Sequence, residues 1–167
     1  LGGLGIIHRY NTIEFQRKLV SSIIKTKNKS AAIGVSGDYK ERLSALVEND
    51  LNIVCIDIAH GDHILMEEAI EYIRSNYPDL FVIAGPCSAE SREQVNQIAQ
   101  ALSLNSTAHL LRAGIWKPRT HPDSFEGLGE KALPWLVEAG KEYDIPTCIE
   151  VANKSHVEAA LKAGVNA

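Results

Sequence analysis

Leu80-Phe81-Val82-Ile83-Ala84-Gly85 is an apolar run that ends in glycine, and a helical pattern follows it. The apolar residues of that pattern recur at spacings of three and four, at Val95, Ile98, Ala99 and Leu102. A strand that is covered on both faces is apolar through most of its length, as this run is. The stretch therefore predicts a β-strand followed by an α-helix, which together form one βα unit.

Runs of the same kind recur along the chain and alternate with helical patterns. Such alternation implies parallel strands joined by right-handed crossovers. We predict an α/β fold, a partial (β/α)8 TIM barrel of about six βα units, as a single domain over residues 1–167. The last helix is expected near Lys154–Lys162. The predicted strands are Leu4–His8, Ala31–Ser36, Asn52–Asp57, Leu80–Gly85, His109–Gly114 and Pro146–Val151.

A doubly wound open sheet has the same alternation of strands and helices. Two features favour the barrel: polar residues and glycines gather after the strands, and no G-x-G-x-x-G follows the first strand. A closed barrel usually needs roughly 250 residues. The chain has 167 residues, so we expect a barrel that is open or incomplete. Its uncovered sheet edges would favour self-association or pairing with a missing barrel half.

Charge and composition exclude several classes of partner. The net charge of −4 gives no reason to expect a nucleic acid or an acidic membrane as partner. The three cysteines are few and widely spaced, which argues against a disulfide framework and for a reducing compartment. The chain begins without Met, and it ends at Ala167, where another strand is expected to begin. We therefore expect a cytoplasmic fragment.

Helix starts are predicted from polar residues that precede a Glu or Gln by three positions. This spacing is that of the capping box, in which the two side chains satisfy backbone N–H groups of the first helical turn. The pairs are Asn11 with Glu14, Asp38 with Glu41, and Ser91 with Gln94.

Asp57 ends the predicted strand Asn52–Asp57, where a barrel strand presents side chains to the active-site face. A carboxylate there could accept hydrogen bonds from a ribose hydroxyl pair, or it could cap the following loop. His60 and His63 have a spacing that metal ligands can have, but no third ligand lies at a helpful distance along the chain. Gly34-Val35-Ser36-Gly37-Asp38 could offer N–H groups to a phosphate or could be a tight turn.

The first half of the chain resembles the IMP dehydrogenase/GMP reductase family over about residues 1–85. The resemblance rests on four strands and implies that Asp57 contacts the nicotinamide ribose of NAD(P). Asp62-His63 departs from the family's His-Ser, and nothing in the chain matches the G-P-G-S-x-C loop that carries the family's catalytic thiol. The matching stretches are Gly2–His8, Ala32–Val35, Ile56–Gly61 and Val82–Gly85.

Three cations lie in the eight residues Arg112–Arg119, at the end of an apolar strand. Two guanidinium groups and an ammonium group can neutralise a phosphate and a carboxylate together. The alternative is a solvated basic loop.

Cys87 stands in the loop Gly85–Ser91, which enters a helix. A helix N-terminus and nearby cations lower the pKa of a thiol, so Cys87 could be a metal ligand or a nucleophile. It could equally be an ordinary buried cysteine, the interpretation that we favour for Cys55 and Cys148.

These two motifs resemble DAHP synthase, in the form fused to chorismate mutase, over about residues 83–167. That family condenses phosphoenolpyruvate with erythrose 4-phosphate and uses a divalent metal. The resemblance implies that Cys87 is a metal ligand and that Arg112 and Lys117 are catalytic and bind phosphoenolpyruvate. It also implies that Lys117, Pro118, Arg119 and Thr120 line the erythrose 4-phosphate site. Further matching stretches are Ser124–Gly127, Ala132–Leu136 and Glu150–Asn153.

The family's remaining metal ligands come from later strands, which lie beyond the end of this chain. His121 and Asp123 also depart from the family pattern. The two resemblances meet at Val82–Gly85. We therefore hold three hypotheses: an incomplete DAHP synthase that takes small phosphorylated substrates, an IMP dehydrogenase/GMP reductase-like oxidoreductase fragment, and a non-catalytic fragment or chimera.

Overall fold

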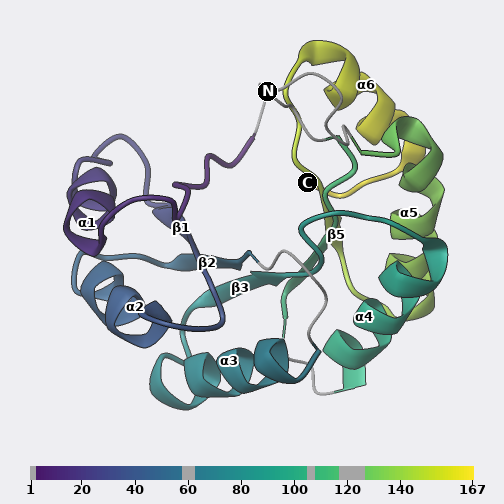
Figure 1. The fold of residues 1–167 in the computed structure, drawn as a ribbon. Coiled ribbons are helices and arrows are strands. Elements are labelled where there is room, and N and C mark those ends of the chain that lie inside the picture. The colour runs from purple at the N-terminus through teal and green to yellow at the C-terminus, as the bar shows by residue number, and fades with distance from the viewer. Residues whose placement is uncertain (1–2, 58–62, 105–107, 117–126) are drawn as a thin grey trace. The chain divides into compact units, whose positions relative to one another are not determined.

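The computed structural model describes residues 3–57, 63–104, 108–116 and 127–167. Helices and strands alternate along the described chain (Figure 1), and the strands form a five-stranded sheet in chain order, β1 to β5. Pairing is parallel between β1 and β2, β2 and β3, and β4 and β5. The predicted α/β fold, a partial barrel of βα units, is thereby confirmed. The strands are β1 (Ser30–Ile33), β2 (Ile53–Ile56), β3 (Phe81–Ala84), β4 (Leu110–Arg112) and β5 (Thr147–Cys148).

The helices that follow the strands have the predicted order and lengths typical of βα units. The last begins at Lys154, as predicted, and ends at Ala163, one residue beyond the expected end. They are α1 (Ile13–Ser21), α2 (Tyr39–Val47), α3 (His63–Asn76), α4 (Arg92–Leu104), the 3₁₀ helix η1 (Gly129–Ala132), α5 (Leu133–Glu142) and α6 (Lys154–Ala163). In the part of the chain that the structure describes, none of the helices is both long and apolar enough to cross a membrane.

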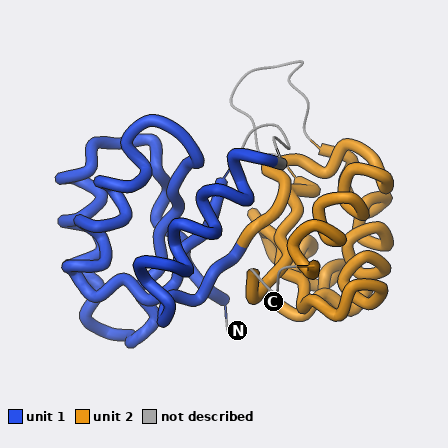
Figure 2. Tube along the Cα trace, turned by 90° about the horizontal axis from the view of Figure 1, so that it is seen from below, with its two compact units in different colours: residues 1–58, 62–83 blue, residues 59–61, 84–167 orange. Residues whose placement is uncertain are grey.

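The chain divides into two compact units, coloured separately in Figure 2. Unit 1 comprises the described residues up to Ile83, and unit 2 comprises those from Ala84 onward. The predicted division of the chain at Val82–Gly85, where the two family resemblances meet, stays a prediction, because a compact unit does not show which family its sequence resembles.

Unit 1 has a core built from its strands and from α2 and α3. Every residue of β1 is buried, as expected of a strand covered on both faces. Ile33 of β1, Ile56 of β2 and Leu43 of α2 are fully buried, as are Ile70 and Ile73 of α3. The continuous apolar runs that predict the strands therefore have a direct physical cause, which is burial from both sides.

The predicted strand Leu4–His8 is reduced to one bridge. Ile7 pairs in parallel with Ala31, donates to the Ser30 carbonyl at 3.0 Å and accepts from the Ala32 N–H at 2.8 Å. Leu4 and Ile6 are 41% and 38% exposed, so their side chains gain little from an extended ladder.

Of the predicted capping boxes, the one at Ser91 and Gln94 forms, with its return bond going to the residue before Ser91. Ser91 Oγ accepts from the Gln94 N–H at 3.1 Å, and Gln94 Oε1 reaches back to the Glu90 N–H at 2.8 Å. The cap of α1 is Thr12, which accepts from the Phe15 N–H, and the prediction of Asn11 was wrong by one residue. Asp38 precedes α2 but makes no capping bond, because its carboxylate binds a side chain instead, as described below.

Unit 2 places α4 and α5 side by side and packs α5 against β5. Gly140 of α5 is required there, because a Cβ at that position would collide with Thr147. The segment Val165–Ala167 runs along β5. Ala167 donates to the Thr147 carbonyl at 3.0 Å and accepts from the Ile149 N–H at 3.1 Å, which is the bonding pattern of a parallel ladder.

Candidate functional site

Asp57 lies at the carboxyl end of the first two strands of unit 1. Its N–H donates to the Ile33 carbonyl at 2.9 Å, which fixes the residue beside the end of β1. Its carboxylate is 16% exposed, and Oδ2 lies 3.5 Å from Nε of Arg9. The structure thus places Asp57 at the strand end expected for it, beside Arg9, a cation outside the predicted site residues.

Arg9 reaches Asp57 from the segment that follows the Ile7 bridge. Its guanidinium carbon lies 4.8 Å from the centre of the Tyr10 ring. Gly34 is also near the guanidinium, because an added Cβ at Gly34 would lie 3.5 Å from Nη1 of Arg9. One sequence feature could have revealed Arg9. It is a cation directly after the predicted strand Leu4–His8, and Asp57 is likewise a charged residue at the end of a predicted strand.

A buried polar network holds the segment that carries Arg9. Gln16 is fully buried, and its amide nitrogen donates to the carbonyls of Ile7, His8 and Ala32 at 3.3, 3.2 and 2.9 Å. Its Oε1 accepts from Arg42 Nη1 at 2.8 Å. These bonds attach the residues before Arg9 to the end of β1.

Arg42 completes this network from α2. Its Nη2 donates to Asp38 Oδ2 at 2.7 Å, and its Nε donates to Oδ1 at 3.3 Å, which is a bidentate pair. A further bond from Nη2 reaches the Asn11 carbonyl at 3.1 Å. A carboxylate that holds a guanidinium in this way no longer caps α2, which explains the missing cap at Asp38.

In unit 2, Arg112 is the last residue of β4 and is almost completely buried, with 4% of its side chain exposed. Its Nη2 donates to Glu150 Oε1 at 2.8 Å, and Glu150 follows β5. Glu150 belongs to one of the stretches that resemble DAHP synthase, but no motif in the sequence indicates its bond to Arg112. Two neighbouring strands therefore end in a buried cation and its carboxylate partner.

The loop that carries Cys87 is bonded to the segment after β4. The Ala89 N–H donates to the Gly114 carbonyl at 2.8 Å, and the Gly114 N–H donates to the Pro86 carbonyl at 3.2 Å. Gly85 permits this approach, because its φ is 144° and a Cβ would collide with the Arg112 carbonyl oxygen. Cys87 is half-buried. That the thiol and the Arg112 guanidinium serve one substrate stays a prediction.

The other predicted residues of the second half, Lys117, Pro118, Arg119 and Thr120, lie outside the described residues, as do His121 and Asp123. His60 of the first half does as well. Within residues 3–57, 63–104, 108–116 and 127–167, no group of three or more His, Cys, Asp or Glu could hold a metal ion. Cys87 as a metal ligand therefore stays a prediction, and we derive no catalytic step through a metal.

Trp116 and His156 form an aromatic stack near the start of α6. Their ring centroids are 4.1 Å apart and their planes differ by 2°. His156 Nδ1 accepts from the Ala152 N–H at 3.3 Å, and Asn153 caps α6 by accepting from the His156 N–H at 3.0 Å. The stack thus attaches the segment after β4 to the N-terminus of α6.

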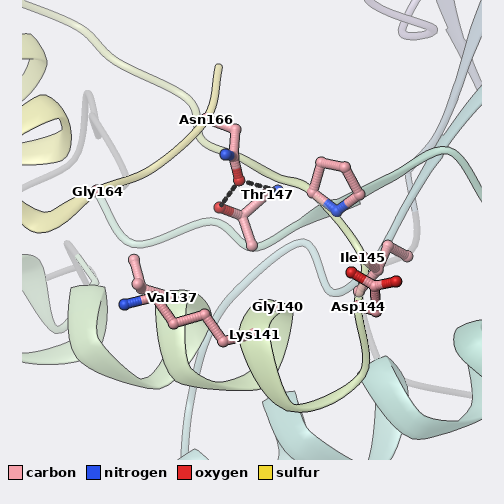
Figure 3. Close-up of a pocket in the computed structure, with 9 residues that line it drawn as sticks. Val137, Gly140, Lys141, Asp144, Ile145, Thr147, Gly164 and Asn166 are labelled. Atoms are coloured by element: carbon pink, nitrogen blue, oxygen red, sulfur yellow. Dashed lines mark hydrogen bonds between the residues drawn. The ribbon is translucent and has the colours of Figure 1, made fainter.

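A pocket of about 230 Å³ lies at the amino end of β5, within unit 2 (Figure 3). Its lining includes Lys141 and Asp144. Thr147 and Asn166 are joined at its wall by bonds from the Thr147 N–H and hydroxyl to Asn166 Oδ1, at 2.8 and 3.1 Å. The pocket contains no predicted site residue and lies at the opposite end of β5 from Glu150.

Comparison with known proteins assigns the chain to a family. A family model described as "IMP dehydrogenase / GMP reductase domain" matches residues 1–115. The chain belongs to the IMP dehydrogenase/GMP reductase family. The match covers Asp57 and runs past residue 85, through β3 and β4, into the region where we also noted a resemblance to DAHP synthase.

Individual relatives support this membership. The inosine-5'-monophosphate dehydrogenase of Halalkalibacterium halodurans is 47% identical over 148 residues, which are 81% of this chain and 30% of the relative. That of Aquifex aeolicus is 28% identical over 82% of this chain and 28% of the relative. The chain therefore spans less than a third of the length of these IMP dehydrogenases.

The resemblance to DAHP synthase is also present. The phospho-2-dehydro-3-deoxyheptonate aldolase of Thermotoga maritima, a DAHP synthase, is 52% identical over 62 residues, which are 37% of this chain and 18% of the relative. This similarity is closer than those to the IMP dehydrogenases but covers a much smaller part of the chain. Both resemblances are thus confirmed, and the IMP dehydrogenase/GMP reductase family accounts for the larger part of the chain.

Proposed function

We propose that this member of the IMP dehydrogenase/GMP reductase family binds a nicotinamide nucleotide through the ribose hydroxyls, with Asp57 as the acceptor. The observation that carries the proposal is the position of Asp57, a partly exposed carboxylate fixed to the carboxyl end of β1 and β2. Parallel α/β folds bind their ligands at that end of the strands. A carboxylate accepts two hydroxyl hydrogen bonds without any change in its own protonation.

We propose that the chain binds the nicotinamide nucleotide, and we do not propose that it catalyses hydride transfer. The family resemblance implies a covalent route through a thiol in a G-P-G-S-x-C loop, and this sequence contains no such loop. Gly85-Pro86-Cys87-Ser88 resembles it only superficially. When NAD(P) is bound, its nicotinamide ring supplies the hydride acceptor or donor, and this chain supplies ribose recognition at Asp57.

Titration of the full chain with NADH tests the proposal, with NADH fluorescence as the readout. Asp57→Asn should weaken binding by about tenfold or more, because an amide replaces a charged acceptor. The matched control is Asp79→Asn, which removes the same charge from an exposed position in unit 1 and should bind like the parent. Equal affinity of the parent and Asp57→Asn would reject Asp57 as the ribose ligand.

A second candidate function is favoured by the close similarity to the Thermotoga maritima aldolase. In this interpretation Arg112, Lys117 and Arg119 bind small phosphorylated substrates such as phosphoenolpyruvate. Lys117→Ala should weaken binding of phosphoenolpyruvate, and Lys131→Ala, at an exposed lysine of η1, should not. Equal affinity of Lys117→Ala and the parent would eliminate this site.

We do not expect the chain alone to synthesise DAHP, because the resemblance places the remaining metal ligands beyond Ala167. Consumption of phosphoenolpyruvate with erythrose 4-phosphate by the pure chain, dependent on an added divalent metal, would overturn this expectation.

A cytoplasmic location and self-association through open sheet edges also remain proposals. Sedimentation of the pure chain over a range of concentrations tests the second of these.

A further inference from the structure

Arg9 and Asp57 present opposite charges at the same end of the strands of unit 1. Nε of Arg9 lies 3.5 Å from Asp57 Oδ2, within the range of an ion pair. Nε is nevertheless buried without a hydrogen-bond partner among the described residues. Since the pair is not hydrogen-bonded through Nε, the attraction that holds the two side chains together is weaker than that of a bidentate arginine–carboxylate pair.

The Arg9 guanidinium has a further neighbour besides Asp57, which is the Tyr10 ring. The guanidinium carbon lies 4.8 Å from the centre of the Tyr10 ring, and Gly34 leaves space beside Nη1, where an added Cβ would lie at 3.5 Å. Gln16 fixes the preceding backbone through the carbonyls of Ile7 and His8. The Arg9 side chain is 29% exposed, so an incoming ligand can reach it. A guanidinium positioned in this way is preorganised to bind an anion.

The two charges together match one chemical class of ligand. A carboxylate recognises neighbouring hydroxyls of a sugar, and a guanidinium recognises the oxygens of a phosphate. We propose that Arg9 binds the phosphate of a ribose phosphate whose hydroxyls are accepted by Asp57. Unit 1 therefore distinguishes phosphorylated ribose from ribose alone. This inference rests on the proposed function, because it takes Asp57 as the ribose ligand.

Nicotinamide mononucleotide and nicotinamide riboside form the appropriate pair of probes, because they differ only in the phosphate. Calorimetric titration of the full chain should show the mononucleotide binding about tenfold or more tightly, as expected for one charged hydrogen-bonded contact. Arg9→Gln should abolish this difference and leave the affinity for the riboside unchanged. Arg9→Lys should retain part of the difference, since it keeps the charge but loses the fork of donors.

Two further variants separate the possible failures. Arg17→Gln removes an exposed arginine from α1 and should leave both affinities unchanged. Asp57→Asn should weaken both probes equally. If Arg9→Gln keeps the parent's preference for the mononucleotide, or if the parent shows no such preference, Arg9 is not the phosphate ligand. In that case the proposed function still holds, provided that Asp57→Asn weakens the binding of both probes. If Asp57→Asn binds the riboside like the parent, or the parent binds neither probe, the proposed function fails and this inference fails with it. Unfolding curves that match the parent show that each variant is folded.

Discussion

The Arg112 guanidinium and the Glu150 carboxylate are joined by a bond of 2.8 Å, yet their exposures are very different, at 4% and 57%. A charged group as buried as Arg112 depends on its acceptors, because it has lost its contact with water. Glu150 is separated from it by 38 positions in sequence, so the bond joins the ends of two successive strands. The pair therefore contributes to the packing of β4 against β5.

Replacing Glu150 by Ala should lower the free energy of unfolding by about 1–3 kcal/mol, because a buried guanidinium loses an acceptor. Glu150→Gln keeps an acceptor oxygen and should lose less. Urea denaturation followed by circular dichroism measures both changes. Glu158→Ala is the control, since its bond to Lys154 joins two exposed side chains and should contribute less than about 1 kcal/mol. Equal losses for Glu150→Ala and Glu158→Ala would contradict this assignment.

Gln16 should be among the least replaceable polar residues of unit 1. Gln16→Ala removes a fully buried amide and leaves the carbonyls of Ile7, His8 and Ala32 without that donor. The expected loss is about 2–4 kcal/mol in the free energy of unfolding. Gln100→Ala removes the same side chain from an exposed position on α4 and should change stability by no more than about 0.5 kcal/mol. A Gln16→Ala variant as stable as Gln100→Ala would disprove the importance of the network.

Gly85 is required by its backbone angle and by its closeness to Arg112. Gly85→Ala should destabilise by at least about 2 kcal/mol, because a Cβ would collide with a main-chain carbonyl that cannot move aside. Gly37 has a φ of 64° with open space around it, so Gly37→Ala should lose only about 1–2 kcal/mol. The denaturation midpoints of the two variants test the difference, and a smaller loss for Gly85→Ala would contradict the packing described here.

Tyr72 should make the stability of unit 1 sensitive to alkaline pH. Burial, and then the neighbouring Tyr77, raises the pKa of Tyr72 above its ordinary value of 10.0. Because the folded protein disfavours the phenolate, this contribution to stability is complete below pH 10 and is lost as the pH rises through the higher pKa of the folded state. Tyr72→Phe should remove that part of the decline. Thermal unfolding between pH 8 and 11 compares the two proteins, and identical profiles would exclude Tyr72 as the cause.

The strands could be predicted because burial on both faces leaves a continuous apolar run, as in β1, and the run is visible without any knowledge of neighbours. The cap of α1 was placed at Asn11 because neighbouring Asn and Thr residues have nearly equal capping propensity, and only the geometry selects Thr12. Asp57 could be predicted from its position after a strand. The position of Arg9 directly after a predicted strand is visible in the same way. Its pairing with Asp57, like that of Arg112 with Glu150, joins residues far apart in the sequence, and no local pattern records such a contact.

The network around Gln16 restricts what evolution or design can place there. Glutamate has the same shape, but its carboxylate would direct negative charge at the backbone oxygens that now accept a hydrogen bond from the amide. Asparagine is one methylene shorter and would not reach both those oxygens and Arg42. Of the polar side chains, glutamine combines the needed reach with a neutral head that both donates and accepts. The conformation of the backbone at Ile7 and His8 thus depends on the hydrogen bonds of a single carboxamide side chain.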